Sequence, residues 1–277
     1  MLAPAATALL VLASLAAVRI QPGSAKPGDA VLITVQGTDP PHEPQGRLGA
    51  FDLDFLPFAG GWQALVGMPV DTKDGALELS VRMVSGAQEL DLQGTLEIVA
   101  PEFRTSELKV SKKFVSPSKA QREWSKRDQI AFDAAFAQAR GERQFLENFA
   151  WPRNGVVTAP FGDLRMFNGK KKSQHFGVDL NGAIGDEVYA SNDGTVVMQR
   201  ECFGSGNTLV IFHGMSLYTV YFHLSRFDVK SGQKVKKGQQ IGLIGKTGRV
   251  TGPHLHWGAK IAGRWVDAQS VLRLDFQ

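Results

Sequence analysis

Cysteine is almost absent from this chain, which has one, Cys202, in 277 residues. A single cysteine excludes disulfide bonds within the chain. It also excludes cysteine-based zinc sites, because these need three or four sulfur ligands or a cysteine pair with histidines. Any zinc-type site must therefore be built from histidine and carboxylate groups.

Long apolar runs are missing as well, since no stretch reaches the roughly eighteen residues that a membrane-spanning helix needs. The first eighteen residues, MLAPAATALLVLASLAAV, carry no charge and combine an apolar run, Ala8 to Leu12, with small residues after it. This pattern predicts a candidate signal peptide at 1–18 and export to the periplasm, cell envelope or exterior, with no stable membrane span after processing. The usual basic residues before the apolar run are absent, so an ordinary buried segment is the alternative.

Nucleic-acid-binding motifs are also absent, although the C-terminal part is basic. Residues 151–277 contain 16 Lys and Arg against 9 Asp and Glu, an excess of seven positive charges, whereas residues 1–110 contain 7 against 13. A basic surface can contact nucleic acid, an anionic envelope polymer or only solvent. Without a helix-turn-helix, zinc-finger or aromatic-basic RNA-binding motif, we expect no nucleic-acid partner.

From residue 19 to 115, short β-rich runs alternate with turn signals, as in AVLITVQG and GALELSVRMV. In the second run the charged residues Glu78 and Arg82 alternate with apolar neighbours, as expected when one face of a strand is buried. These patterns predict an antiparallel β-sandwich that forms an accessory domain.

The spacing of apolar residues changes from a strand-like to a helix-like period at about residue 116, and residues 116–150 are predicted to form a helical connector. Ser118 and Gln121 stand at capping-box spacing, and Gly141 indicates a break. The expected apolar stripe, which would pack the helix on one of the domains, consists of Trp124, Ile130 and Phe136.

Residues 151–277 return to short β-runs separated by many glycines, such as NTLVIFH, LYTVYFH and HLHWGAK, and no helix is evident among them. This composition predicts a compact antiparallel β-sandwich or barrel. The fold class expected for the whole chain is therefore mainly β, with a helical connector between two β domains.

The candidate catalytic and metal-binding side chains cluster in this last part. They lie in HFGVD at 175–179, YFH at 221–223 and HLH at 254–256. A catalytic zinc usually has three protein ligands from His and Asp or Glu, with water in the fourth position. In an extended strand the two histidines of HLH lie on one face about 7 Å apart, so each can bind one metal or flank it. His175 and Asp179 need a bend between them, and Gly177 at the midpoint suits one.

Isolated histidines in β-rich domains are more often hydrogen-bonded structural residues than ligands. We expect this of His42, and of His213, which precedes a glycine at a strand end. The remaining four histidines and their aspartate are expected to form one site.

The stretches HFGVDL, YTVYFHLS and KKGQQIGLIGKTGRVTGPHLHW resemble the motifs of the lysostaphin-type (LytM-like) zinc endopeptidases that cut peptidoglycan cross-bridges. The resemblance covers about residues 151–270. It implies a zinc metallopeptidase domain at 151–277, built as a β-sandwich with an open groove. One Zn²⁺ would be held by His175, Asp179 and His256, and His223 and His254 would act on water and substrate. The implied substrate is a peptidoglycan peptide, and a regulatory envelope protein is a further candidate partner.

Some features depart from the family pattern or allow other functions. Trp257-Gly258 after HLH and Phe212 before His213 put substrate preference in doubt. One alternative is a catalytically silent envelope scaffold or an activator of another wall hydrolase. VKKGQQIGLIG also suggests a lipoyl- or biotinyl-type carrier, but the short sequence around a modifiable lysine is missing. Which peptide bond is cut, and which of His223 and His254 is the general base, stay open.

Overall fold

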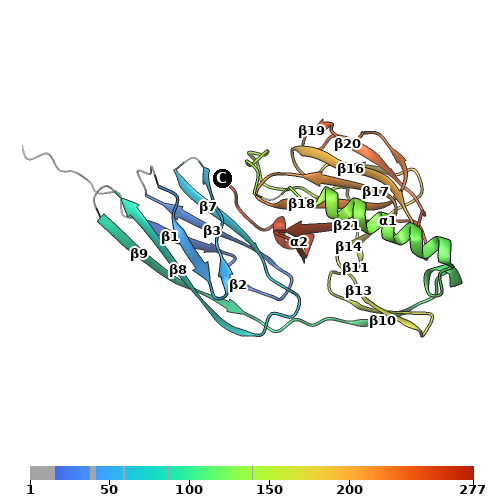
Figure 1. Cartoon of the computed structure of the whole chain (residues 1–277), viewed down its shortest axis with the longest axis horizontal. Coiled ribbons are helices and arrows are strands. Elements are labelled where there is room, and N and C mark those ends of the chain that lie inside the picture. Colours follow the sequence, from blue (N-terminus) through green and yellow to red (C-terminus); the bar gives the residue numbers. More distant parts are fainter. Residues whose placement is uncertain (1–15, 38–41, 59, 86–87, 139) are drawn as a thin grey trace, which may run out of the picture.

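The computed structural model of the protein describes residues 16–37, 42–58, 60–85, 88–138 and 140–277. As predicted, the described chain is mainly β. Two β-rich halves lie along its long axis, and a long helix lies against the C-terminal half (Figure 1). Most of the candidate signal peptide, residues 1–15, lies outside the described residues, and strand β1 begins at Ala17. Among the described residues, no helix has the length and apolarity of a membrane span.

The N-terminal half is the expected β-sandwich. Its first sheet has the order β1-β3-β7-β6, with strands at Ala17–Gln21, Ala30–Gln36, Gly61–Gly67 and Phe55–Phe58. The second has the order β2-β9-β8-β4-β5, with strands at Ser24–Ala25, Gln88–Ile98, Gly75–Ser85, Gln45–Leu48 and Phe51–Asp52. In β8, Leu79 and Val81 are buried while Glu78 and Arg82 are exposed, which confirms the predicted alternation.

Strand β10 (Thr105–Leu108) lies apart from this sandwich, although the predicted accessory domain extends to residue 115. It pairs in parallel with β12 (Leu164–Phe167), which pairs with β13 (Lys171–Gln174). The chain then passes through a short 3-10 helix, Lys112–Phe114. The segment after residue 100 therefore contributes a strand to the C-terminal half.

Helix α1 (Lys119–Ala135) follows, and its start was predicted correctly. The Ser118 hydroxyl accepts a hydrogen bond from the Gln121 amide, and the Gln121 side chain accepts one from the Ser118 amide. The helix ends before Gly141, and the second half of the connector is not helical, which corrects the prediction. Its phenylalanines Phe145 and Phe149 are instead buried in the C-terminal core.

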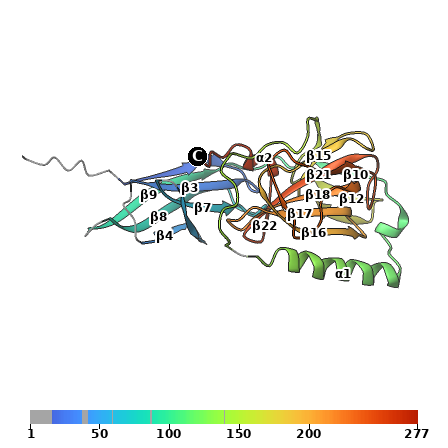
Figure 2. The ribbon, with the colours of Figure 1, turned by 90° about the horizontal axis from the view of Figure 1, so that it is seen from above.

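The apolar stripe of α1 differs in part from the expectation. Ile130 is 68% exposed, whereas Phe132 and Phe136 pack with Ala135 against the outer face of the C-terminal sheet. Trp124 lies with its ring 5.8 Å from the ring of Phe203. Figure 2 shows α1 along one side of the C-terminal half, beside β16.

The C-terminal half is built on a strongly bent antiparallel sheet of order β11-β14-β21-β18-β17-β16-β19. These strands span Val157–Ala159, Val178–Asn181, His254–Ile261, Leu217–Phe227, Gly206–Phe212, Gly194–Cys202 and Lys234–Val235. The flanking strands β15, β20 and β22 span Glu187–Tyr189, Gln240–Ile244 and Arg264–Val266. The helical turn α2 (Ala268–Val271), capped by Asp267, was not predicted.

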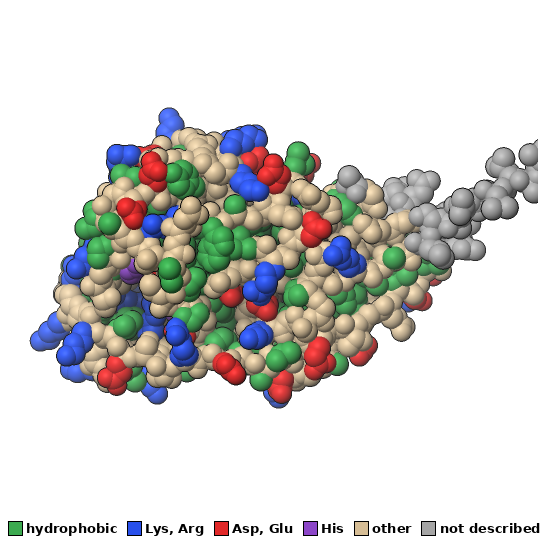
Figure 3. All heavy atoms as spheres, turned by 180° about the vertical axis from the view of Figure 1, so that it is seen from behind, with side chains coloured by type: hydrophobic (Ala, Val, Ile, Leu, Met, Phe, Trp, Pro, Cys, Tyr) green, Lys and Arg blue, Asp and Glu red, His purple; other side chains and the backbone are tan. Residues whose placement is uncertain are grey.

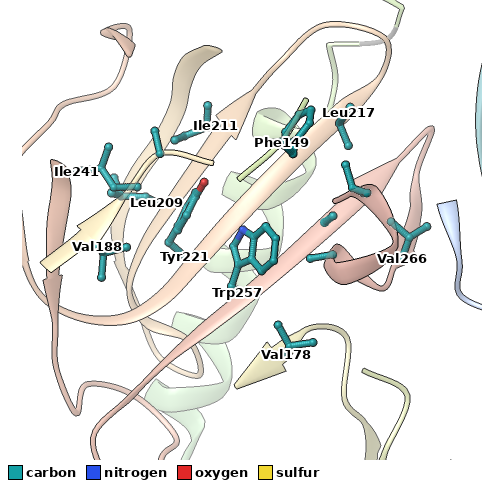
Figure 4. Close-up of a cluster of buried hydrophobic side chains, with 14 of the residues drawn as sticks. Phe149, Val178, Val188, Leu209, Ile211, Leu217, Tyr221, Ile241, Trp257 and Val266 are labelled. Carbon is teal, nitrogen blue, oxygen red and sulfur yellow. The ribbon is translucent and has the colours of Figure 1, made fainter. Parts of the chain in front are cut away.

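The core of this half includes Val178, Leu209, Tyr221 and Trp257, which converge between the strands (Figure 4). Ala30 of the N-terminal sandwich belongs to the same buried cluster. Its amide donates a hydrogen bond to the Ser270 hydroxyl at 2.8 Å, and Arg273 pairs with Asp29 at 3.0 Å. The two halves are therefore joined by apolar and polar contacts.

Candidate active site

Three adjacent strands bring the predicted site together. β14 pairs with β21 so that Asp179 lies directly opposite His256, and β21 pairs with β18 so that Phe222 lies opposite His256 on the other side. His175 stands just before β14, after β13 has ended. The chain bends at Gly177, as predicted from the spacing of His175 and Asp179.

The side chains of His175, Asp179 and His256 converge on one point. His175 Nε2 and His256 Nδ1 each lie 3.0 Å from Asp179 Oδ1 and 2.9 Å from each other. All three residues are buried. The sequence prediction that these residues form one site is consistent with this geometry.

The donor atoms of this triad fit a divalent metal ion. His175 Nδ1 lies 2.8 Å from the carbonyl oxygen of Pro160. Because a carbonyl oxygen only accepts, Nδ1 must carry the proton and Nε2 presents its lone pair to the triad. Two imidazole nitrogens and a carboxylate oxygen within about 3 Å of one another are the ligand set and compactness that zinc requires.

The charges of the triad suit the same purpose. Burial disfavours ionisation of Asp179, but the electrostatic influence of the adjacent His175 and His256 rings outweighs it and holds the pKa of Asp179 well below its usual value. Burial lowers the pKa of His256 to about 4, although Asp179 opposes this shift. An ionised carboxylate and a neutral imidazole are the forms that bind metal.

Gly177 is required here for space. Its backbone φ is not in the left-handed region, but a Cβ at this position would stand 2.5 Å from His256 Nε2 and 2.8 Å from the Trp257 carbonyl oxygen. The His256 ring also stacks on Phe222, with centroids 4.9 Å apart and an interplanar angle of 7°. Gly177 directly precedes β14, and Phe222 lies on β18, the strand on the other side of β21. The His256 ring therefore has close neighbours from both flanking strands.

Arg165 is a site residue that sequence reasoning missed. Its guanidinium donates to Asp179 Oδ2 at 2.7 Å, which leaves Oδ1 directed at the two histidines. Arg165 lies on β12, ten residues before His175. One arginine in a basic segment has no diagnostic spacing, so only the fold, which brings Arg165 to Asp179, reveals its role.

His223 reaches the site through an unusual backbone conformation. In a regular strand it would share a face with Tyr221, whose side chain is in the core. His223 instead has φ +66°, where non-glycine residues are rare, and the pairing of β18 shifts register next to it. Its ring consequently turns toward His254 and His256, with centroid distances of 4.9 and 6.1 Å.

His254 lies at the open side of the triad. Its Nε2 is 3.7 Å from Asp179 Oδ1, and its side chain is 16% exposed. Both histidines of HLH thus approach the same carboxylate oxygen, which confirms that they share a strand face. His254 Nδ1 lies 2.9 Å from the Gly252 carbonyl oxygen, as His223 Nδ1 lies 2.8 Å from that of Thr247.

Comparison with known proteins agrees with this geometry. Residues 173–268, which contain the triad, β18 and HLH, match the family model described as Peptidase family M23. The chain carries an M23 peptidase domain.

The curated relatives share this M23 domain. Over 102 residues, 37% of this chain and 24% of the relative, the chain is 52% identical to the peptidoglycan DD-endopeptidase ShyA of Vibrio cholerae. Over 97 residues, 35% of this chain and 22% of the relative, it is 42% identical to the DD-carboxypeptidase/endopeptidase Mpg of Neisseria meningitidis. The matches thus span about a quarter of the length of these relatives.

A solved structure shares the fold of nearly the whole chain. The crystal structure of a "putative peptidase M23" from Pseudomonas aeruginosa superposes with a TM-score of 0.64. The match covers 89% of this chain and 94% of that chain, at 24% sequence identity. The arrangement of the two β-rich halves therefore occurs in another solved structure.

Two adjoining pockets of the M23 domain flank the triad of His175, Asp179 and His256. One, of about 420 Å³, is lined by His175, His223 and His256 together with Asp128 and Phe132 of α1. The other, of about 520 Å³, is lined by Asp179, His223 and His254 together with residues of β10. No described residue of the N-terminal sandwich lines either one, so α1 and β10 are the walls added to the M23 domain.

Helix α1 is fixed in this position by Asp128. The buried carboxylate accepts hydrogen bonds from Arg200 Nε at 3.1 Å and from the Phe203 amide at 2.7 Å. The Phe132 ring also contacts Phe222, the residue that stacks on His256. The connector therefore supports one side of the groove.

The two histidines assigned structural roles lie outside the triad. His42 is exposed. His213 is fully buried and bonded through its two ring nitrogens to the Asp193 carbonyl oxygen and the Thr219 hydroxyl. Burial lowers the pKa of His213 to about 4, so this histidine is a neutral core residue.

Proposed function

We propose that the M23 domain is a zinc-dependent endopeptidase that hydrolyses peptide cross-bridges of bacterial peptidoglycan. The observation that carries the proposal is the convergence of His175 Nε2, Asp179 Oδ1 and His256 Nδ1 beside two further histidines in an open groove. Relatives named as peptidoglycan DD-endopeptidases support the substrate class.

His175, Asp179 and His256 would hold the zinc ion through these three atoms. When bound, zinc would lower the pKa of a water molecule to about 7 and polarise the scissile carbonyl. Arg165 would keep the Asp179 carboxylate oriented for this task, since it occupies the other oxygen. The buried surroundings strengthen each of these electrostatic interactions.

His223 and His254 would move the protons. Each has its Nδ1 against a backbone carbonyl oxygen, of Thr247 and Gly252 respectively, so each Nδ1 donates and each Nε2 is unprotonated in the neutral ring. An unprotonated Nε2 facing the groove is the state that a general base needs. We assign to this pair the transfer of a proton from the attacking water to the leaving amine and, in the protonated form, stabilisation of the oxyanion.

The site of action follows from the substrate. Peptidoglycan lies outside the cytoplasmic membrane, so an enzyme that cuts it must be exported to the envelope, in accord with the candidate signal peptide at 1–18. The basic character of the C-terminal part favours attraction to an anionic wall polymer. A regulatory envelope protein that acts on α1 or β10 remains a proposal.

The test is digestion of purified peptidoglycan by the zinc-loaded protein, with mass spectrometry of the soluble products. His254→Ala, which leaves all three proposed ligands in place, is the matched variant. Release of peptide fragments by the parent protein and not by the variant supports the proposal. Stoichiometric zinc with no fragments released from any of several wall types would instead indicate the scaffold or activator.

A further inference from the structure

A cationic side chain without a partner lies in the groove. Arg249 lines both pockets beside the triad, together with His223. Its guanidinium lies over the Phe167 ring, with its central carbon 4.4 Å from the ring centroid. Its backbone amide donates to the Gly204 carbonyl oxygen at 2.7 Å. The side chain is thus positioned by stacking, and it forms no ion pair or hydrogen bond with any residue that the structure describes.

The carboxylates that line the groove are already engaged by other arginines. Asp128 pairs with Arg200, Asp163 with Arg104 and Asp179 with Arg165, at 3.1, 3.0 and 2.7 Å. None of these acceptors therefore neutralises Arg249. Free positive charge is in excess at this point of the groove.

Further cations reinforce this excess. Burial, followed by repulsion from Arg165, lowers the pKa of Arg249. Burial and repulsion from Arg249 likewise lower the pKa of Lys171. The repulsive part of each shift shows that these positive charges lie near one another. Figure 3 shows a histidine inside a hollow of this face, with lysine and arginine side chains beside it.

We propose that Arg249, supported by Arg165 and Lys171, binds a free carboxylate on the substrate next to the scissile amide. This inference rests on the proposed function and adds a specificity-determining residue to it. A planar guanidinium stacked on an aromatic ring binds carboxylates in a bidentate manner, and a partly desolvated setting strengthens such hydrogen bonds. The site is adjacent to the metal ligands, because Arg165 itself bonds Asp179.

The position of this charge distinguishes two kinds of cross-bridge. When a cross-link joins the carboxyl group of one D-amino acid to a side-chain amine on a second D-centre, that second centre carries its own carboxyl group. This carboxylate ends the branch and lies two bonds from the scissile nitrogen. In a glycyl-glycine bridge the corresponding carboxyl is consumed by the next peptide bond. Arg249 therefore selects a cross-link between two D-configured carbons in which the carbon that supplies the amine also carries a free carboxylate.

The experiment uses two synthetic cross-linked peptides that differ only at this carboxyl, as the free acid or as the primary amide. Zinc-loaded full-length protein is compared with Arg249→Met, which keeps an apolar side chain over Phe167 without the charge. Arg226→Gln is the control, because Arg226 is exposed, bonded to Asp228 and absent from both groove linings. We expect the parent protein and Arg226→Gln to favour the acid over the amide by about 10- to 100-fold in kcat/KM.

In Arg249→Met we expect this preference to fall to within about twofold. An acid preference that persists in Arg249→Met would overturn the proposal. Calorimetric binding of the same two peptides to the His254→Ala protein, with and without Arg249→Met, tests the subsite independently of hydrolysis. If the parent protein hydrolyses neither peptide, the proposed function fails. The binding preference still decides the subsite, which is refuted if the acid and the amide bind equally.

Discussion

Substitution of Gly177 by alanine should damage the proposed metal site without removing a proposed ligand. The new methyl group would stand 2.5 Å from His256 Nε2 and 2.6 Å from Cε1, whereas ordinary contacts begin at 3.4 Å. The His256 ring or the strand must therefore retreat by about 0.9 Å, the difference between 2.5 and 3.4 Å. Phe222, on the strand across β21 from β14, stacks on the same ring and restricts such a retreat.

A displacement of this size exceeds what zinc coordination tolerates. Metal–ligand distances vary by about 0.2 Å, and a misplacement of about 1 Å near the reacting atoms can cost about 100-fold in rate. We expect Gly177→Ala to weaken zinc binding by about 10- to 100-fold, by analogy with losses of supporting contacts around metal ligands. We also expect kcat/KM on peptidoglycan fragments to fall by about 100-fold.

Competition with a fluorescent zinc chelator measures the affinity, and thermal unfolding of the metal-free protein verifies that the variant folds. Gly204→Ala is the matched control, because Gly204 lines the same groove and no atom lies within 4 Å of where its Cβ would be. Its zinc affinity should equal that of the parent protein. If Gly177→Ala binds zinc as tightly as the parent, the reasoning about His256 is wrong.

Other predictions concern the catalytic pair, a buried histidine and the core. His254→Ala should retain zinc, measured by elemental analysis, but lose about 10²- to 10⁴-fold in turnover. His256→Ala should lose both zinc and turnover. Full zinc occupancy in His256→Ala would contradict the assignment of His256 as a ligand. Because the pKa of His213 is about 4 when folded and near 6.5 when unfolded, its contribution to stability is complete above pH 6.5 and declines toward pH 4. Urea unfolding should therefore show that the free energy of unfolding falls by about 2 to 3 kcal/mol between pH 7 and pH 4.5 through His213, a loss that is absent in His213→Gln. If the free energy of unfolding depends on pH equally in both proteins, His213 is not the origin of the loss. Phe145→Ala should cost about 3 to 5 kcal/mol of unfolding free energy in urea, because the ring is buried in the C-terminal core; a cost below 1 kcal/mol would mean that the segment does not belong to that core.

Features that depend on neighbouring residues were readable from the sequence. The capping box of Ser118 and Gln121 places the start of α1, because the two residues satisfy each other's backbone amides within one turn. The alternation around Leu79 identifies a half-buried strand for the same local reason. The three histidine motifs indicate metal chemistry through short spacings, since the two histidines of HLH share a face of a single strand.

Long-range packing decided the rest. Arg165 and Phe167 lie in a different segment from HLH, and no spacing rule connects them to it, so only the approach of β12 to the groove gives them a role. Arg249 precedes HLH by five residues, but its stacking on Phe167 is visible only in the fold. The end of α1 at Ala135 also follows from tertiary contacts. Burial of Phe145 and Phe149 in the C-terminal core stabilises the chain more than extension of the helix would. Likewise, the place of β10 in the C-terminal half depends on its partner β12, which is more than fifty residues away in the chain.

The sequence by itself thus determined the fold class and the residue types of the site, because periodicity, capping and short motif spacings are local properties of the chain. Only the tertiary structure decided why Gly177 must lack a side chain, how the left-handed backbone of His223 turns its ring into the groove, and which cations remain unpaired there. These properties depend on atoms that are distant in sequence and close in space. Hydrogen bonding, steric exclusion and charge compensation act on that spatial distance.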